Sequence, residues 1–391
     1  MTVTLVSSWA FSPWRLEAAT TAAAYLMSIG VDELDVVRAD LDMRYVRENP
    51  RPAVDALLAR VRSLPGYPQP PATWADLGSY AASAAQTADA WLASGCHWAQ
   101  GYSGPGSGAD HLTMALLRHR GVLPLWTAHL TGTLSHADDG RLLGERVGAD
   151  PMRSAAREAL TTRPPSDLVS DWLAALIAAH ADMIVVASEH LRDHFLALPS
   201  VQPYRDRVAD RVRVWSRPGV AAPSDGPSDR SSDPARSARE TRHLVVTTRV
   251  DAERLPSLVP VLTAYGLLSA HDREQVQLRV LTNDPTGAAI QLRRSELEGL
   301  VSVEADASPV VSAERAAQGD FALVVDRPAP EGLGYALGDL PELADHAACG
   351  TAVILLCPQD SPLSRYDVAH HLPAGNVSAA LALLRRLAGS T

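Results

Sequence analysis

Two arginines in the sequence are suited to holding a phosphorylated ligand. Arg249 follows the run His243–Thr248, which predicts a buried strand, and Arg254 comes five residues later, where a helix is expected to begin. Free backbone N–H groups at the start of a helix already favour an anion, and two guanidinium groups would strengthen that preference. The pair is chemically suited to a diphosphate, although Arg254 also fits a helix residue that faces solvent.

A histidine is the second candidate for chemistry. His129 ends the apolar run Leu123–His129, which predicts another buried strand. Ligands of open α/β sheets bind beyond the carboxyl ends of the strands, so His129 could orient a hydroxyl group or share a proton. A structural role in the core is the alternative. The following residues 135–139 include a histidine and two aspartates, but we interpret them as a solvated loop, and no metal ion or other cofactor is expected.

Two further stretches have alternative interpretations. The glycines of Gly104–Gly108 precede a helix expected from about Ala109, where they could cradle a phosphate, although a plain turn is the preferred interpretation. The loop after the first expected strand contains Trp9 and Trp14 and no glycine. These tryptophans could line a surface that binds a ligand, or they could pack in the core.

The composition excludes several classes of protein. With 391 residues, 46% of them apolar, the chain is long enough for two or three globular domains. The net charge of −10 gives no basic face for nucleic acid or anionic lipid, although peripheral membrane contact stays open. All 35 basic residues are arginine, which excludes a Schiff-base lysine and a Walker-type lysine.

The cysteines and the hydropathy indicate the compartment. The 3 cysteines form no C-x-x-C pair, and an odd number argues against a disulfide framework, so a reducing cytoplasm is expected. The amino terminus lacks the pattern of a signal peptide, and no apolar stretch is long enough to span a membrane.

Apolar runs and helical patterns alternate in two halves of the chain. The first half contains the expected strands Val3–Ser7, Leu34–Val37, Met183–Ala187 and Arg211–Trp215, with Ser188 as a helix N-cap and a proline-rich loop at 50–75. The second half contains the expected strands Gln277–Thr282, Leu300–Glu304, Phe321–Val325 and Thr351–Cys357, and it closes with a helix at Val377–Leu387. Residues 221–242 are rich in Ser, Asp, Pro and Arg, which is typical of a flexible linker.

The segment from Ala181 to Val220 resembles the end of the first domain in family-4-like glycosyltransferases of the GT-B fold. The matching residues are Ala181-Asp182, Ser188, Leu191, Asp193, Arg213-Val214 and Pro218-Gly219-Val220. The sequence around His129 is also similar to a segment of that family in which a histidine lies beside the donor sugar. The resemblance covers about half of the chain through its motifs and the rest through the order of elements.

The resemblance implies a set of donor-binding residues in the second half. Arg249 and Arg254 match an arginine and a lysine that hold the donor diphosphate. Glu331 and Gly332 are similar to the family's "EGFG" motif. Cys349–Val353 resembles the entry to a later strand, which implies that Asp345, or Glu342 one helical turn earlier, binds the ribose. The two acidic motifs match in register only if about six residues are inserted between them.

These observations lead to one expected architecture. We expect an α/β protein of the GT-B class, with two Rossmann-like domains whose parallel sheets face each other across a cleft. Residues 1–220 would form the acceptor-side domain, 221–242 a linker or loop, and 243–391 the domain that binds the nucleotide sugar.

The expected function is metal-independent transfer of a sugar, resembling that of hexosyltransferases, with retained anomeric configuration. The donor would be a nucleotide sugar, and the acceptor an envelope glycan, a glycolipid or a small molecule. Two alternatives stay open. One is a non-catalytic partner of another transferase, because several family motifs are altered. The other is an epimerase or hydrolase of nucleotide sugars.

Overall fold

The structure of the chain is a computed structural model. It describes residues 2–12, 16–41, 52–135, 144–219, 242–246, 255–282, 292–293, 298–299, 301–305, 315, 317–326, 341–359 and 361–389. These residues form two compact units, of which the first extends to Arg217 and the second begins at Pro218. The predicted linker lies outside the described residues except for Arg242, which is the first residue of a strand.

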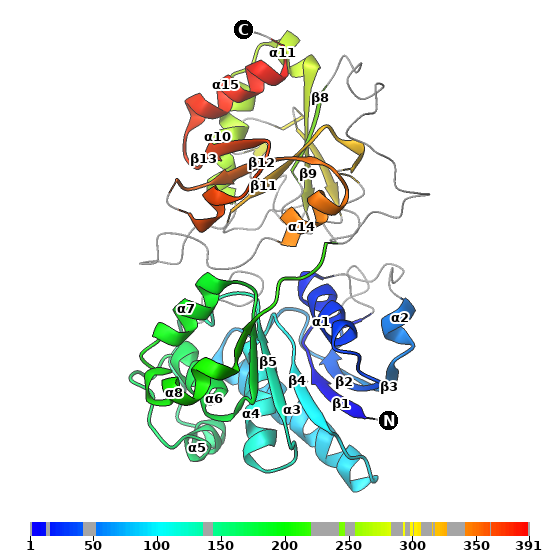
Figure 1. Ribbon diagram of the computed structural model, residues 1–391, viewed down its shortest axis with the longest axis vertical. Coiled ribbons are helices and arrows are strands. Elements are labelled where there is room, and N and C mark those ends of the chain that lie inside the picture. Colours follow the sequence, from blue (N-terminus) through cyan, green and yellow to red (C-terminus); the bar gives the residue numbers. More distant parts are fainter. Residues whose placement is uncertain are drawn as a thin grey trace. The chain divides into compact units, whose positions relative to one another are not determined.

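The first unit is built on a seven-stranded sheet with the order β3-β2-β1-β4-β5-β6-β7 (Figure 1). Its neighbouring strands all pair in parallel. The strands are β1 Val3–Ser7, β2 Glu33–Ala39, β3 Leu58–Leu64, β4 Gln100–Ser103, β5 Trp126–Leu130, β6 Met183–Val186 and β7 Val212–Val214. Parallel neighbours require crossover connections, and each of the six connections in this unit contains at least one helix.

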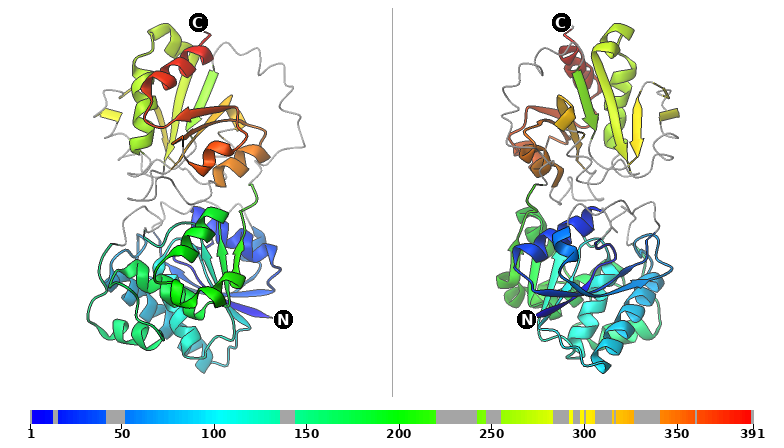
Figure 2. Two further views of the ribbon diagram at one scale, coloured as in Figure 1. Left: turned by 60° about the vertical axis from the view of Figure 1, so that its left-hand side comes forward. Right: turned by 90° about the vertical axis from the view of Figure 1, so that its right-hand side faces the viewer.

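The helices of this unit cover both faces of its sheet. They are α1 Glu17–Ser28, α2 Pro52–Asp55, α3 Trp74–Ala93, α4 Gly108–His119, α5 Pro151–Glu158, α6 Val169–His180, α7 Glu189–Ala197 and α8 Arg205–Val208. Val6 of β1 packs in the core cluster of α1, whereas its neighbour Ser7 bonds to Asp110 of α4. Successive strand residues point to opposite faces, so α1 and α4 lie on opposite sides of the sheet (Figure 2).

Side-chain caps explain where several helices begin. Ser188 accepts a hydrogen bond from the backbone N–H of Leu191, so the predicted N-cap of α7 is confirmed. Ser107 caps α4 in the same way through the N–H of Ala109.

The second unit is built on a six-stranded parallel sheet with the order β10-β9-β8-β11-β12-β13. Its strands are β8 Arg242–Val246, β9 Val276–Thr282, β10 Ser302–Ala305, β11 Phe321–Val325, β12 Ala352–Cys357 and β13 His370–Pro373. Its described helices are α10 Leu255–Gly266, α11 Ala270–Gln275, α14 Pro341–Ala348 and α15 Val377–Leu387.

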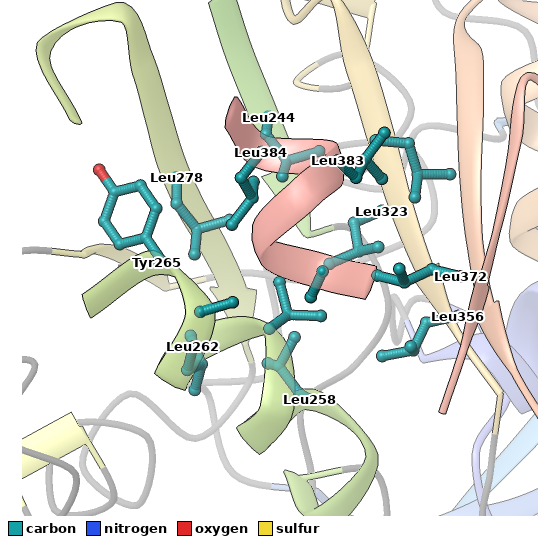
Figure 3. Packing of buried hydrophobic residues seen from close by; sticks show 14 of the residues in the cluster. Leu244, Leu258, Leu262, Tyr265, Leu278, Leu323, Leu356, Leu372, Leu383 and Leu384 are labelled. Carbon is teal, nitrogen blue, oxygen red and sulfur yellow. The ribbon is translucent and has the colours of Figure 1, made fainter. Parts of the chain in front are cut away.

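The two faces of this second sheet have separate cores. Leu323 of β11 and Leu356 of β12 pack with α10 and α15, as Figure 3 shows. The neighbouring residues in the chain, Val324 and Leu355, point to the opposite face of the sheet, where they pack with Leu343 of α14. Strands buried on both faces lack polar alternation, which is why FALVV and AVILL are continuous apolar runs in the sequence.

Two edge strands correct the sequence-based expectations. We expected a loop at 50–75, but Leu58–Leu64 forms β3 at one edge of the first sheet. We assigned no element between Cys357 and Val377 from the sequence, and His370–Pro373 forms β13 there, at the edge of the second sheet. The prediction of a loop was wrong because an edge strand buries few side chains, and a sequence such as LARVRSL, with four exposed residues in succession, has little apolar signal.

Within the described parts of the chain, no helix combines the length and the apolar character that crossing a membrane requires.

Candidate functional site

The order of the second sheet points to one place for a ligand. From β8, the chain adds β9 and β10 successively toward one edge of the sheet. It then returns to add β11, β12 and β13 toward the other edge, so the direction of the connections reverses between β8 and β11. These two strands pair directly, with Leu244 opposite Phe321 and Val246 opposite Leu323. Loops that leave the carboxyl ends of two such strands diverge to opposite faces, and the crevice between them is the usual ligand site of open α/β sheets.

Four of the predicted site residues follow these two strands in the chain. Arg249 comes three residues after the end of β8, with Arg254 directly before α10, and Glu331 and Gly332 follow β11. All four lie outside the described residues, and their roles therefore stay predictions.

An aspartate that the sequence analysis did not identify marks the exit from β11. The N–H of Asp326 bonds to the carbonyl of Leu356, and its Oδ2 accepts a hydrogen bond from Ser361 Oγ at 2.8 Å. The Asp326 side chain is buried. These bonds fix the last described residue after β11, from which the chain continues toward Glu331. Its only sequence signal is an acidic residue directly after a strand.

Helix α14 carries the other two predicted donor-binding residues. Glu342 and Asp345 are three residues apart and so are neighbours on one side of the helix. The Glu342 side chain is partly buried and that of Asp345 is 2% exposed. Gly350 ends this segment with a φ of 65°, a conformation that favours glycine, and it turns the chain into β12. This explains the glycine in the matched Cys349–Val353 segment.

His346, on the same helix, is uncharged at neutral pH. Burial lowers the pKa of its imidazole to about 4, and the nearby charge of Glu342 opposes this shift only in part. The acidic side chains of α14 therefore have no cationic histidine beside them at neutral pH.

In the first unit, His129 is enclosed by aromatic side chains. It is the penultimate residue of β5, which begins and ends later than the predicted strand Leu123–His129. Its ring lies 5.2 Å from that of Tyr25, 6.0 Å from that of Tyr102 and 5.5 Å from that of Trp215. Tyr102 Oη is 2.8 Å from Nδ1, while Nε2 has no hydrogen-bond partner among the described residues.

The burial of His129 determines its charge. The side chain is 0% exposed, and this burial lowers its pKa to about 3, with a further contribution from His111. His129 is therefore a neutral imidazole at physiological pH. It can offer one hydrogen bond through Nε2, but it is no source of positive charge. A substrate hydroxyl would reach Nε2 only after the surrounding side chains moved.

The corresponding reversal point of the first sheet, between β1 and β4, holds a buried carboxylate. Asp110 of α4 accepts hydrogen bonds from Ser7 Oγ at 2.7 Å and from the backbone N–H of Trp9 at 2.8 Å. Its side chain is 0% exposed, and burial raises its pKa to about 7. No pattern in the sequence predicts this role, because an acidic residue in the first turn of a helix is common.

The two loops at this point are packed against each other. A Cβ atom on Gly104 would lie 2.3 Å from Ser8 Oγ, and one on Gly108 would lie 2.5 Å from a methyl carbon of Leu173. Gly104 and Gly108 therefore serve close packing, and Gly106 adopts a turn conformation with a φ of 104°, which supports the plain-turn interpretation. Trp9 is 4% exposed and its indole N–H donates to the carbonyl of Tyr67, so it packs in the core; Trp14 lies outside the described residues.

Metal binding has no support in the described parts of either unit. No three His, Cys, Asp or Glu side chains there lie close enough together to hold an ion. Most of the segment 135–139, which includes His136 and two aspartates, lies outside those parts. The expectation of a metal-independent protein therefore stays a prediction.

Comparison with solved structures identifies the architecture. HepE from Anabaena, crystallised with UDP and glucose, matches with a TM-score of 0.55 at 12% identity, over 99% of this chain and 89% of that one. Sucrose-phosphate synthase from Thermosynechococcus elongatus matches with a TM-score of 0.59 at 12% identity, over 100% and 90%. The fold is that of the GT-B glycosyltransferases. The predicted fold class is therefore confirmed, with two Rossmann-like units built on parallel sheets.

Sequence comparison and a third structure limit what this similarity means. No family model matches the sequence, and no curated protein does so either. A Listeria monocytogenes structure, assigned as a UDP-N-acetylglucosamine 2-epimerase, matches with a TM-score of 0.55 at 9% identity, over 99% of this chain and 88% of that one. The same fold thus serves more than one reaction of nucleotide sugars, and the site residues must decide between them.

Proposed function

We propose that this protein is a glycosyltransferase that moves a sugar from a nucleotide sugar to an acceptor. The nucleotide would bind to the second unit, beyond the carboxyl ends of β8 and β11. The observation that carries the proposal is the coincidence of topology and sequence: the two strands at the reversal point are the two that lead to Arg249 and Glu331.

The proposed chemistry rests on charge rather than on a protein nucleophile. When the bond to the donor sugar breaks, negative charge develops on the leaving diphosphate, and Arg249 and Arg254 would stabilise it. Glu342 or Asp345 would accept hydrogen bonds from the ribose hydroxyls, and Glu331 with Gly332 would lie near the sugar. Neutral His129 would orient a sugar hydroxyl through Nε2. Retention of configuration, independence from metal ions and a hexose as the transferred sugar belong to this proposal.

The acceptor class and the compartment are parts of the same proposal. An envelope glycan, a glycolipid or a small molecule remains the proposed acceptor, and peripheral membrane contact remains compatible with a lipid-linked one. All 3 cysteines are free and buried, which supports a reducing compartment such as the cytoplasm.

A non-catalytic partner of another transferase is the second candidate. It is favoured by the enclosure of His129 and by the β1–α1 loop, where the N–H groups of Ser8 and Trp9 already bond to Val37 and Asp110. Such a loop has fewer N–H groups left for a substrate. An epimerase or hydrolase of nucleotide sugars would need an additional pair of acid and base residues at the same site.

Nucleotide binding tests the proposal first. UDP, GDP, ADP and dTDP are titrated calorimetrically, without added metal, into the wild-type protein and into Arg249→Ala and Arg254→Ala. We expect one nucleotide to bind and each variant to weaken it about tenfold or more, because a hydrogen bond from a charged group is lost.

A matched variant controls for the change in net charge. Arg385→Ala removes an exposed arginine from α15 and should leave the affinity unchanged. If the wild type bound none of the four nucleotides, the diphosphate site would be refuted and the partner protein would become the leading candidate.

A further inference from the structure

The segment Pro218–Gly219, which we call the strap, runs directly against helix α14. A Cβ atom placed on Gly219 would lie 2.2 Å from the carbonyl oxygen of Ala344 and 3.0 Å from Cβ of Ala348. The strap and the helix both belong to the second unit, although 125 residues separate Gly219 from Ala344. Figure 1 shows the described chain that follows β7 ending beside α14.

Space, rather than backbone conformation, explains the glycine at this position. Gly219 is not among the glycines with positive φ, so another residue could adopt its backbone angles. The obstacle is the backbone carbonyl of Ala344, which cannot turn away as a side chain can. The hydrogen that stands in place of Cβ points toward this oxygen, as in a Cα–H···O contact. Ala344 and Ala348 are themselves small, which lets the two segments approach closely.

The strap and the sheet hold α14 between them. Leu343 anchors the helix in the core formed by Val324, Val353 and Leu355, and the adjacent residue Ala344 meets the strap. Asp345 directly follows Ala344, and Glu342 lies two residues before it. A displacement of the helix at Ala344 would therefore move both acidic side chains.

We infer that Gly219 is a positioning residue for ribose recognition: the strap fixes α14 at the depth at which Glu342 and Asp345 meet the ribose of the nucleotide. This inference rests on the proposed function, because it assigns those two carboxylates to the ribose and the arginines to the diphosphate. This role of Gly219 concerns the ribose of the ligand and not its diphosphate. Moving α14 should affect recognition of the ribose and leave recognition of the diphosphate unchanged.

Gly219→Ala tests this separation. Relief of the contact requires the strap or α14 to move by roughly 1 Å, and such a shift breaks hydrogen bonds whose donor–acceptor distances span only about 2.7–3.2 Å. UDP, GDP, ADP and CDP, their 2′-deoxy analogues and pyrophosphate are titrated into the wild type and the variant. We expect the wild type to prefer a ribonucleotide to its 2′-deoxy analogue by about tenfold or more. The variant should lose this preference and keep its affinity for pyrophosphate.

A second variant approaches the same contact from the helix. Ala348 is exposed, and its Cβ faces the strap. The variant Ala348→Leu should therefore fold, and its larger side chain should push the strap away from α14. It is expected to reduce ribose preference as Gly219→Ala does. Two substitutions serve as controls: Ala347→Leu, at the adjacent exposed residue of α14, and Gly132→Ala, where an added Cβ would meet nothing within 4 Å. Both should behave as wild type.

The outcomes distinguish this inference from the proposed function. If the wild type prefers the ribonucleotide and both strap variants keep that preference, the role of Gly219 is refuted while the donor site stands. If the variants lose pyrophosphate and ribonucleotide binding equally, the contact serves only the stability of the unit and the inference is again refuted.

If the wild type binds a nucleotide and its 2′-deoxy analogue equally, the inference is refuted as well. Hydrogen exchange decides the case in which the wild type binds no nucleotide and the proposed function fails. Faster exchange of the α14 amides in Gly219→Ala, with no change in Gly132→Ala, would still support the hold of the strap on the helix. Unchanged exchange would refute it.

Discussion

Tyr102 Oη lies 2.8 Å from Nδ1 of His129, and both side chains are buried inside the first unit. Tyr102 is on β4 and His129 is on the neighbouring strand β5, so the sheet itself brings them together. The hydroxyl fixes the plane of the imidazole and leaves Nε2 as the ring nitrogen that is open to another partner. This bond holds the predicted catalytic histidine in one orientation.

Tyr102→Phe should therefore destabilise the fold. The substitution leaves Nδ1 of His129 buried without a partner, which costs about 1–3 kcal/mol of unfolding free energy. Urea denaturation measures the difference. Tyr25→Phe is the matched control: among the described residues, Tyr25 Oη reaches only the sulfur of Met183, at 4.0 Å, so its loss should cost about 0.5 kcal/mol or less. Equal effects of the two substitutions would contradict an orienting role for Tyr102.

Asp110 should make stability depend on pH. Burial raises its pKa in the folded protein from 3.8 to about 7, so between these values the folded state binds more protons than the unfolded state. The favourable contribution of Asp110 to the unfolding free energy is fully present below about pH 4 and is lost as the pH rises through about 7. The loss is on the order of 4 kcal/mol at most.

The measurement compares wild type with Asp110→Asn by urea denaturation at a series of pH values. The difference in unfolding free energy between the two proteins should change across this window and level off above it. Ser7→Ala removes a hydrogen bond that lowers the pKa of Asp110, and it should move the upper end of this window to higher pH. A difference that does not vary with pH would contradict the assignment.

His129 should contribute to the pH dependence with the opposite sign. Burial lowers its pKa from 6.5 to about 3, so the unfolded state binds more protons between these values. Its contribution to stability is present above about pH 6.5 and is lost as the pH falls toward 3. His129→Gln should make the protein less sensitive to acid over this range, as measured by urea denaturation at each pH. An unchanged acid slope would indicate that the imidazole is accessible to water.

Gly101→Ala tests the packing of β4 against Leu123 and against Met114 of α4. The added Cβ would lie 2.5 Å from Leu123 Cδ1 and 3.1 Å from Met114 Sδ, so we expect overpacking to cost about 1–3 kcal/mol. Leu123→Val removes the δ carbons, and the cost of Gly101→Ala should be smaller in that background. Gly132→Ala, which has open space around it, serves as the control in a thermal melt. Additive effects of the two substitutions would contradict the contact.

The buried parts of the fold were predictable from local patterns. Val3–Ser7 and Phe321–Val325 are strands at their predicted bounds, and Val377–Leu387 is a helix at its predicted bounds. Each carries a strong signal, either a continuous apolar run or helical spacing, because its burial is dictated by its own side chains. The edge strands β3 and β13 carry no such signal. Their backbone groups form hydrogen bonds to one neighbouring strand, and few of their side chains are buried.

The candidate site was predictable only in part. Local residue types and the resemblance pointed to Arg249, Glu331 and Asp345, and these assignments stay predictions. Asp110, by contrast, acquires its bonds from Ser7, which is 103 residues away in the chain. Such a pairing leaves no local mark, because the strand order that brings β1 beside α4 is a property of the whole sheet.

The sequence by itself determined the class of the protein: alternating apolar runs and helical stretches require stacked strand–helix units, and the absence of lysine excludes whole mechanisms. Only the tertiary structure decided the strand order, and with it the reversal point between β8 and β11. It also decided that His129 is enclosed and that Gly219 meets Ala344. Burial and close approach depend on residues that are far apart in the chain. The distances between such residues in space are set only when the sheets and helices pack.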